Sequence, residues 1–276
     1  MREVFDQIAA AAAYLKSRTD FQPRVGLILG TGLGGLAEQI DAVATVPFAA
    51  VPHFVPPTAE SHAGNLVFGS LGGQPVVAMQ GRVHYYEGYT MKQITLPVRV
   101  MRALGVSTLI MSNAVGGMNP QLRPGDISVI TDHINLMGDN PLIGPNDDRL
   151  GVRFPDMSEP YARDYVELLE SVALEQRLPL RRAVYVAVAG PNLETAAEYR
   201  FLRAVGADTV GMSIVPECLV AVHAGLKVLG VSVVTDACFP DALRPADVEQ
   251  IIRVANEATP RLEALVKGFL KRLPVA

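Results

Sequence analysis

The order of apolar and polar residues predicts strands and helices that alternate along the chain. A first helix is indicated by apolar residues on one helical face, namely Val4, Phe5, Ile8, Ala12 and Leu15. Short apolar runs typical of buried strands occupy residues 25–29, 108–112, 127–131, 184–189, 210–213 and 228–235. Helical spacing recurs over residues 91–104, 161–176 and 248–269. This alternation is typical of the α/β class.

A predicted hairpin indicates that some strands of the sheet are antiparallel. The apolar runs 66–71 and 75–80 flank Gly72 and Gly73, and two glycines between strands favour a tight antiparallel turn. We therefore expect a mixed sheet rather than a purely parallel one. No repeat, low-complexity tract or linker divides the chain. The sequence thus predicts a single domain over residues 1–276, with a central mixed β-sheet flanked by helices.

Capping residues and prolines mark several helix boundaries. Thr195 and Glu198 form a capping box that predicts a helix start, and Pro216 marks the start of another helix. Pro260 is expected to kink or break the last helix. The segment 135–161 has little periodicity and contains four prolines. A loop of this length inside a compact domain is usually functional.

Composition and charge restrict the partners and compartments that we expect. The chain has 49% apolar and 19% charged residues and a net charge of −4, so no general attraction to nucleic acid or to an anionic membrane is predicted. Glu3 and Asp6 do not fit a signal peptide, and no run of about 20 apolar residues occurs. Cys218 and Cys238 lack metal-ligand spacing and favour a reducing compartment. We expect a cytoplasmic protein without a metal site.

A glycine-rich loop follows the first predicted strand and reads Gly30-Thr31-Gly32-Leu33-Gly34-Gly35. Glycines let backbone N–H groups approach an anion, and Thr31 adds a hydroxyl donor. The loop also matches the G-x-G-x-x-G pattern of dinucleotide-binding proteins, which requires an acidic residue about 20 positions later. Residues 49–54 read AAVPHF, without an acid. A nicotinamide-dependent oxidoreductase is therefore a remote alternative, beside a tight turn that binds nothing.

Polar side chains recur where predicted strands end. The residues concerned are Arg82, His84, Asn113, Glu194, Ser213 and Asp236. Arginine offers a planar set of donors suited to phosphate. Each residue also has an ordinary explanation: Arg82 could pair with Glu87, and the small-residue stretch 113–117 could be a plain turn after its strand. All of these residues are predicted to lie at strand ends, where open α/β sheets bind ligands. Their shared location therefore favours a ligand site.

Seven stretches of the chain resemble the motifs of the trimeric purine nucleoside phosphorylases, in the same order. They are residues 30–34 (GTGLG), 61–64 (SHAG), 81–88 (GRVHYYEG), 113–117 (NAVGG), 144–149 (GPNDDR), 190–195 (GPNLET) and 210–217 (VGMSIVPE). The match spans nearly the whole chain and is highly specific. It implies a nucleoside phosphorylase fold and a homotrimer that uses inorganic phosphate as co-substrate, without a cofactor.

The resemblance also implies roles for the matching residues. Phosphate would be held by Thr31, Arg82, His84, the Ala114 backbone and Ser213. Sugar and base would be contacted by Tyr86, Leu193, Glu194, Met212 and Asp236, and Phe154 would reach into a neighbouring subunit's site. The catalytic residues implied are His84, Glu194 and Asp236, with the two carboxyl groups facing the edge of the purine.

Two positions depart from the family pattern. Asp236 stands where members that act on 6-oxopurines carry asparagine, and an ionised carboxylate only accepts hydrogen bonds, which suits a 6-amino group. Val248 stands where the family has a histidine for the sugar 5′-hydroxyl, and an apolar residue suits a methylthio group. Glu194, in contrast, is the residue typical of 6-oxopurine enzymes.

The resulting hypothesis is a pentosyltransferase of purine salvage that splits purine (2′-deoxy)ribonucleosides with phosphate into free base and (deoxy)ribose 1-phosphate. Positioned phosphate stabilises the cationic sugar, and hydrogen bonds stabilise the departing base. A methylthioadenosine or adenosine phosphorylase is the main alternative. A non-catalytic nucleoside-binding protein and a hydrolase that uses water are further alternatives, although neither explains the whole set of phosphate ligands.

Overall fold

The computed structural model describes residues 2–30, 34–58 and 63–274. The strands in these ranges are β1 (Val25–Leu29), β2 (Asp41–Pro47), β3 (Asn65–Leu71), β4 (Gln74–Gln80), β5 (Thr108–Gly117), β6 (Ile127–Leu136), β7 (Arg181–Val188), β8 (Thr209–Gly211) and β9 (Lys227–Ala237). The helices are α1 (Arg2–Lys16), α2 (Gly34–Glu38), α3 (Met91–Ala103), α4 (Arg163–Glu175), α5 (Ala196–Ala204), α6 (Val215–His223) and α7 (Val248–Arg272). Short 3-10 turns are η1 (Phe48–Ala50), η2 (Tyr85–Glu87) and η3 (Pro240–Ala242).

The strands form one nine-stranded sheet in the order β2-β3-β4-β1-β5-β8-β7-β6-β9. Because β5 also pairs with β9 along its length, the five strands β5, β8, β7, β6 and β9 close into a ring. β1 is parallel to β4 and β5, whereas β3–β4, β5–β8 and β6–β9 are antiparallel. The predicted α/β class and mixed sheet are confirmed, and the ring closure is an additional feature.

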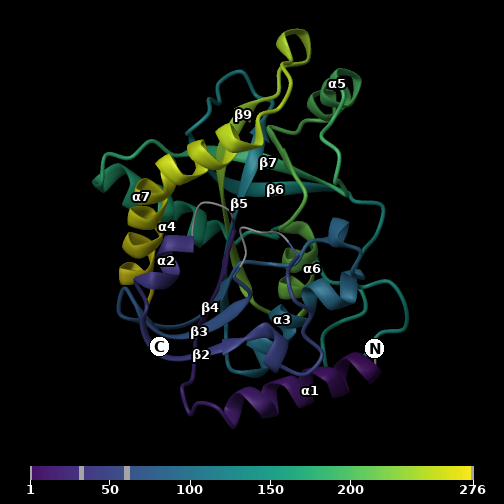
Figure 1. Ribbon diagram of the computed structural model, residues 1–276, viewed down its shortest axis with the longest axis vertical. Helices are drawn as coiled ribbons and strands as arrows, with labels where there is room; N and C mark the ends of the chain where they lie inside the picture. Colours follow the sequence, from purple (N-terminus) through teal and green to yellow (C-terminus); the bar gives the residue numbers. More distant parts are fainter. Residues whose placement is uncertain (1, 31–33, 59–62, 275–276) are drawn as a thin grey trace.

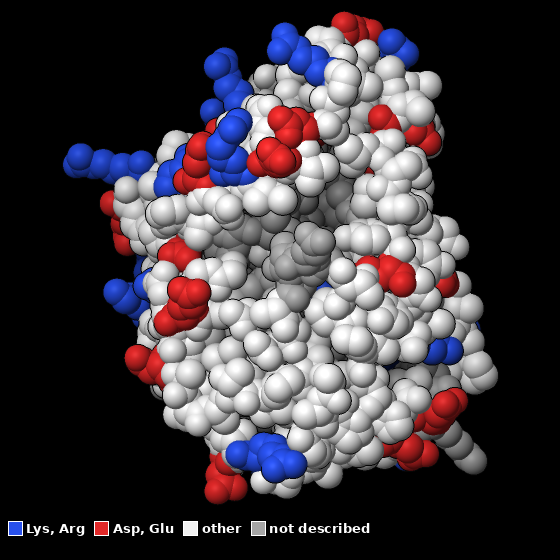
Figure 2. Space-filling model, in the orientation of Figure 1, with Lys and Arg blue, Asp and Glu red and all other residues white. Residues whose placement is uncertain are grey.

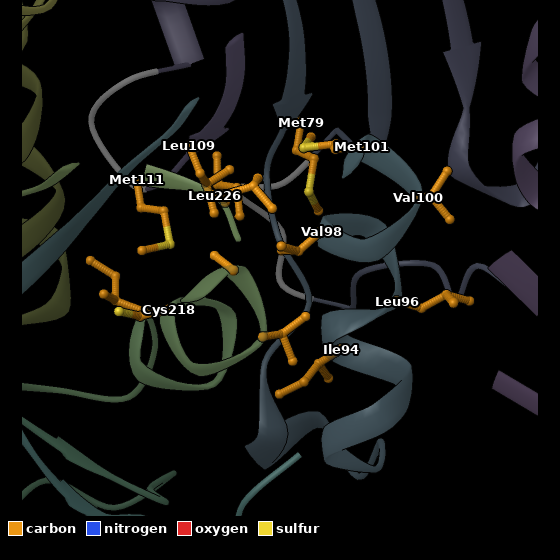
Figure 3. Close-up of a cluster of buried hydrophobic side chains, with 14 of the residues drawn as sticks. Met79, Ile94, Leu96, Val98, Val100, Met101, Leu109, Met111, Cys218 and Leu226 are labelled. Atoms are coloured by element: carbon orange, nitrogen blue, oxygen red, sulfur yellow. The ribbon is translucent and has the colours of Figure 1, made fainter. Parts of the chain in front are cut away.

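Helices cover the sheet in two layers, each over its own hydrophobic core (Figure 1). α1 packs on α3, and α3 packs on α6. Figure 3 shows part of this core, where Met101 of α3, Met111 of β5 and Cys218 of α6 are buried in one cluster. In the other layer α4 and α7 pack together over β9. The strands that end at the candidate site are therefore held between two packed layers.

β5 is longer than the sequence predicts, because it continues through Asn113 to Gly117. The expected turn at residues 113–117 is thus wrong: this stretch pairs with β9 on one side and with β8 on the other. Gly116 and Gly117 fit this crowded position, since a Cβ atom at Gly116 would lie 2.5 Å from the Cys238 Sγ atom. Close packing from both sides, rather than a turn, explains the small residues.

α7 is one continuous helix, although Pro260 lies inside it. Its buried side chains, among them Leu262, Leu265 and Phe269, pack on α4 and β9 and support the helix beyond the proline. The axis of α7 bends along its length in Figure 1, so the expected kink is present and the expected break is not. The capping box of Thr195 and the helix start at Pro216 are confirmed.

Two elements have no counterpart in the prediction, β2 and the short helix α2. β2 is an edge strand that pairs only with β3, and most of its side chains are not buried. It therefore lacks the apolar run by which buried strands are recognised. α2 has five residues, too few to show helical periodicity.

Candidate active site

A cavity of about 200 Å³ lies where β1, β4, β5, β8 and β9 end. Ten of the residues selected from the sequence line it: Arg82, His84, Tyr86, Asn113, Ala114, Leu193, Glu194, Met212, Ser213 and Asp236. Thr31 lies outside the described residues, as do Ser61 and His62 of the second motif. The face of the molecule in Figure 2 is hollowed near its centre, and its charged side chains lie mainly around the periphery.

Arg82 is buried at the floor of this cavity, with 1% of its surface exposed. Its Nη1 group donates to the Ser112 carbonyl and to the Ser213 hydroxyl, both at 3.0 Å. Its Nε atom lies 3.2 Å from Oε1 of Glu217, which is also buried. The alternative of a pair between Arg82 and Glu87 is wrong, because Arg82 pairs with Glu217 instead. Nη2 has no hydrogen-bond partner among the described residues.

His84 is oriented by the carboxylate of Glu87. The His84 backbone N–H donates to Glu87 Oε1 at 2.7 Å, and the ring Nδ1 atom lies 3.1 Å from the same oxygen. Thr58 donates to the other oxygen through its backbone and its hydroxyl. Burial alone would raise the pKa of Glu87, but these hydrogen bonds outweigh it and lower the pKa. The His84 ring also stacks on Tyr86, with ring centroids 4.7 Å apart.

Ser213 is held between β8 and α6 by backbone contacts. The Tyr185 hydroxyl donates to the Ser213 carbonyl at 3.0 Å and accepts from the Ser213 N–H at 3.1 Å. The next residue, Ile214, has a φ of 66°, a left-handed conformation that costs free energy for a β-branched residue. This strained turn places the Ser213 hydroxyl against Arg82 and, at 3.4 Å, against the Asn113 amide.

Two carboxyl groups, Glu194 and Asp236, line the end of the cavity that adjoins a second hollow, which Arg82 does not line. Burial raises the pKa of Glu194, and the nearby charge of Asp236 raises it further. Asp236 lies near the end of β9 with a hydroxyl and a thiol on its two oxygens: Thr235 Oγ1 is 2.9 Å from Oδ1, and Cys238 Sγ is 3.0 Å from Oδ2. This end can therefore accept hydrogen bonds from a flat polar ligand.

A second hollow of about 610 Å³ adjoins the carboxyl end and shares six residues with the cavity: Leu193, Glu194, Tyr199, Thr235, Asp236 and Ile251. Its outer wall is formed by part of the segment 239–247. Val248 lines neither space and is 63% exposed. Ile251, one helical turn further along α7, lines both spaces.

Phe154 also lines neither hollow, and 84% of its surface is exposed. Five further residues were missed by the sequence analysis and line or support the cavity: Tyr199, Glu217, Thr235, Cys238 and Ile251. Glu217 did carry a signal, as a single acid in the otherwise apolar start of α6. Cys238 carried none, because a buried cysteine is usually an inert core residue.

The described part of the chain contains neither a metal-ligand cluster nor a membrane-spanning helix. No group of three or more His, Cys, Asp or Glu residues there is placed to hold a metal ion. None of the helices in residues 2–30, 34–58 and 63–274 is long and apolar enough to span a bilayer.

Comparisons with known proteins agree with this geometry. A sequence profile of the phosphorylase superfamily matches residues 24–271. Purine nucleoside phosphorylase 1 of Bacillus subtilis is 48% identical over 96% of this chain and 98% of its own. The Bos taurus purine nucleoside phosphorylase is 44% identical over 99% and 96%. A crystal structure of isoform 2 of the Schistosoma mansoni enzyme, with cytosine and ribose-1-phosphate, superposes with a TM-score of 0.94, 39% identity and coverage of 99% and 98%. The chain belongs to the phosphorylase superfamily, among its purine nucleoside phosphorylases.

Proposed function

We propose that this protein is a purine nucleoside phosphorylase, a pentosyltransferase that moves the sugar of purine (2′-deoxy)ribonucleosides from the base to inorganic phosphate. The observation that carries the proposal is one cavity lined both by a fixed arginine and by two carboxyl groups. Related Schistosoma mansoni structures contain hypoxanthine, inosine or adenosine, which supports a purine nucleoside as substrate. A nicotinamide-dependent activity is no longer favoured.

The phosphate subsite would be formed by Arg82, His84 and Ser213, with the Ala114 backbone and Thr31. Arg82 and Ser213 present donors from a rigid, buried position, so little reorganisation is needed when the anion binds. A phosphate oxygen then bonds to C1′ as the C1′–N9 bond breaks, and the bonding electron pair leaves with the base. Phosphate supplies the nucleophile, so the proposal requires no metal or organic cofactor.

Glu194 and Asp236 would bind the edge of the purine, with Tyr86 and Met212 beside the sugar and Leu193 over the base. A hydrogen bond or proton delivered to the base at this end stabilises the negative charge that develops on it. Asp236 contacts two side-chain hydrogen-bond donors, and a carboxylate held in this way can accept a hydrogen bond from a 6-amino group. A preference for adenosine or methylthioadenosine is therefore the second candidate, supported also by the apolar Ile251.

We further propose a cytoplasmic homotrimer in which Phe154 reaches into a neighbouring subunit's site. Three apolar residues of one loop, Ile143, Val152 and Phe154, each have more than 60% of their surface exposed, which supports a partner surface. The low net charge of −4 supports small-molecule substrates rather than nucleic acid.

Turnover of inosine, guanosine, adenosine and methylthioadenosine, each with and without phosphate, tests the proposal. We expect release of free base only when phosphate is present, together with a sugar 1-phosphate. Cleavage at the same rate in water alone would instead indicate a hydrolase. Binding without cleavage of any of the four nucleosides would indicate a binding protein.

A further inference from the structure

Cys238 lies in the cavity wall but has no part in the proposed reaction. The side chain follows the end of β9 and has 1% of its surface exposed. Its backbone N–H donates to the Gly117 carbonyl at 2.8 Å, which fixes the residue against the end of β5. From this position the Sγ atom lies 3.0 Å from Oδ2 of Asp236. A buried thiol therefore contacts a carboxylate that the proposed function places at the purine.

The direction of this hydrogen bond follows from the chemistry of the two groups. An ionised carboxylate only accepts, whereas a thiol has one hydrogen to donate. Burial raises the pKa of Cys238, and the charge of Asp236 raises it further, so the sulfur keeps its hydrogen.

Thr235 is a weaker restraint on the position of the Asp236 side chain. Its hydroxyl has one hydrogen and two acceptors in reach, the Val115 carbonyl at 3.2 Å and Asp236 Oδ1 at 2.9 Å. Whenever that hydrogen turns to Val115, Cys238 is the side-chain donor left on Asp236 among the described contacts. The thiol therefore holds the carboxylate in place.

We infer that Cys238 is a specificity-determining residue, which holds the Asp236 carboxylate in place by a hydrogen bond to Oδ2 and thereby favours 6-aminopurines over 6-oxopurines. The ionised carboxylate accepts from a 6-amino group, whereas it meets the oxygen of a 6-oxopurine with an unfavourable contact between two acceptors. Cys238 acts through Asp236 and is a positioning residue. The inference rests on the proposed function only in placing the base at Asp236.

Only small replacements fit at position 238. The Sγ atom faces Gly116 so closely that an added Cβ atom there would lie 2.5 Å away. Alanine removes the donor, and serine keeps a donor of similar size. The pair Cys238→Ala and Cys238→Ser therefore separates the hydrogen bond from the packing of the side chain.

The test is calorimetric binding of free adenine and free hypoxanthine, in phosphate buffer, to the parent protein and to both variants. We expect Cys238→Ala to lower the preference for adenine over hypoxanthine by about three- to tenfold, the effect of one hydrogen bond. Cys238→Ser should keep the preference within about twofold of the parent. In an Asp236→Asn background, Cys238→Ala should leave the ratio unchanged, because the group on which the thiol acts is absent.

An unchanged preference in Cys238→Ala, or an equal fall in the Asp236→Asn background, would overturn the inference. So would failure of the parent protein to bind either base. Base binding does not require cleavage of a nucleoside. A parent protein that binds bases with the expected ratios but releases no base from nucleosides would thus contradict the proposed function and leave the role of Cys238 supported.

Discussion

Arg82 reaches the cavity with its guanidinium already fixed by the Ser112 carbonyl, the Ser213 hydroxyl and the Glu217 carboxylate. Both charged groups of the pair are almost fully buried. Breaking such a pair from one side leaves an uncompensated charge in the interior, which costs more than the pair itself contributes. Arg82 therefore has a structural role and a proposed phosphate-binding role. Substitution of Arg82 alone would change the stability and the phosphate binding at the same time.

Combining two substitutions separates these roles. Arg82→Ala should lower the free energy of unfolding by about 3–5 kcal/mol, because Glu217 is left buried without its partner. Adding Glu217→Gln removes that charge and should recover part of the stability, while the KM for phosphate stays raised by about tenfold or more. Chemical denaturation and phosphate kinetics measure the two effects, and Arg182→Ala, in the exposed pair with Glu170, is the matched control. An unchanged KM for phosphate in the double variant would exclude the proposed role.

A second prediction at the scale of residues concerns Asp236 and the choice of the purine base. Asp236→Asn supplies an amide that can donate to a 6-oxo group, so we expect the kcat/KM ratio of inosine to adenosine to rise about tenfold. Asp241→Asn is the control, since this aspartate is exposed in η3 and lines neither hollow. If the ratio stays the same in Asp236→Asn, the carboxylate does not select the base.

At the scale of elements, the close approach of β1 and β5 is the most restrictive feature of the site. A Cβ atom added to Gly30 would lie 2.4 Å from the Ser112 carbonyl oxygen, and that backbone cannot turn away because β5 also pairs with β9. Ser112 also accepts the Gly30 N–H at 3.1 Å through its hydroxyl. Glycine is thus required at this crossing for reasons of space.

Gly30→Ala should therefore lower the free energy of unfolding by about 1–3 kcal/mol through overpacking. Gly34→Ala is the matched control four residues away, where an added Cβ atom would meet nothing within 4 Å. Alanine is a better helix former than glycine, so this control should leave stability unchanged or raise it by up to about 1 kcal/mol. Equal effects of the two substitutions, measured by urea unfolding, would contradict the steric explanation.

The same elements show what the sequence could predict and what it could not. Strands such as β1 and β9 were recognised because their central residues are mainly apolar, and the site residues were recognised by their motifs at the strand ends. The ring closure of β5 with β9 and the extension of β5 through Gly117 depend on contacts between distant segments, which no local pattern records. Cys238 and Glu217 gain their importance only from such contacts.

At the scale of the whole molecule, the loop with Phe154 does not contribute that side chain to the cavity of its own chain. Phe154 has 84% of its surface exposed and contacts neither hollow of its own chain. A large aromatic side chain left in water is unfavourable unless a partner covers it. In a closed ring of identical subunits, each loop would reach the next site in the same way.

Mixed oligomers distinguish this arrangement from a role within one subunit. Subunits with Phe154→Ala keep their own Arg82, and subunits with Arg82→Ala and Glu217→Gln keep Phe154. When the two kinds of subunit are co-expressed in equal amounts, half of all subunits have Arg82. Half of these would lie next to a subunit that has Phe154. About a quarter of all sites should then be intact in a cyclic trimer.

We expect the activity of the mixture to be clearly above the sum of the activities of the separate variants, measured on material that sediments as a trimer. If the mixture shows no gain although trimers form, Phe154 does not complete a neighbouring site.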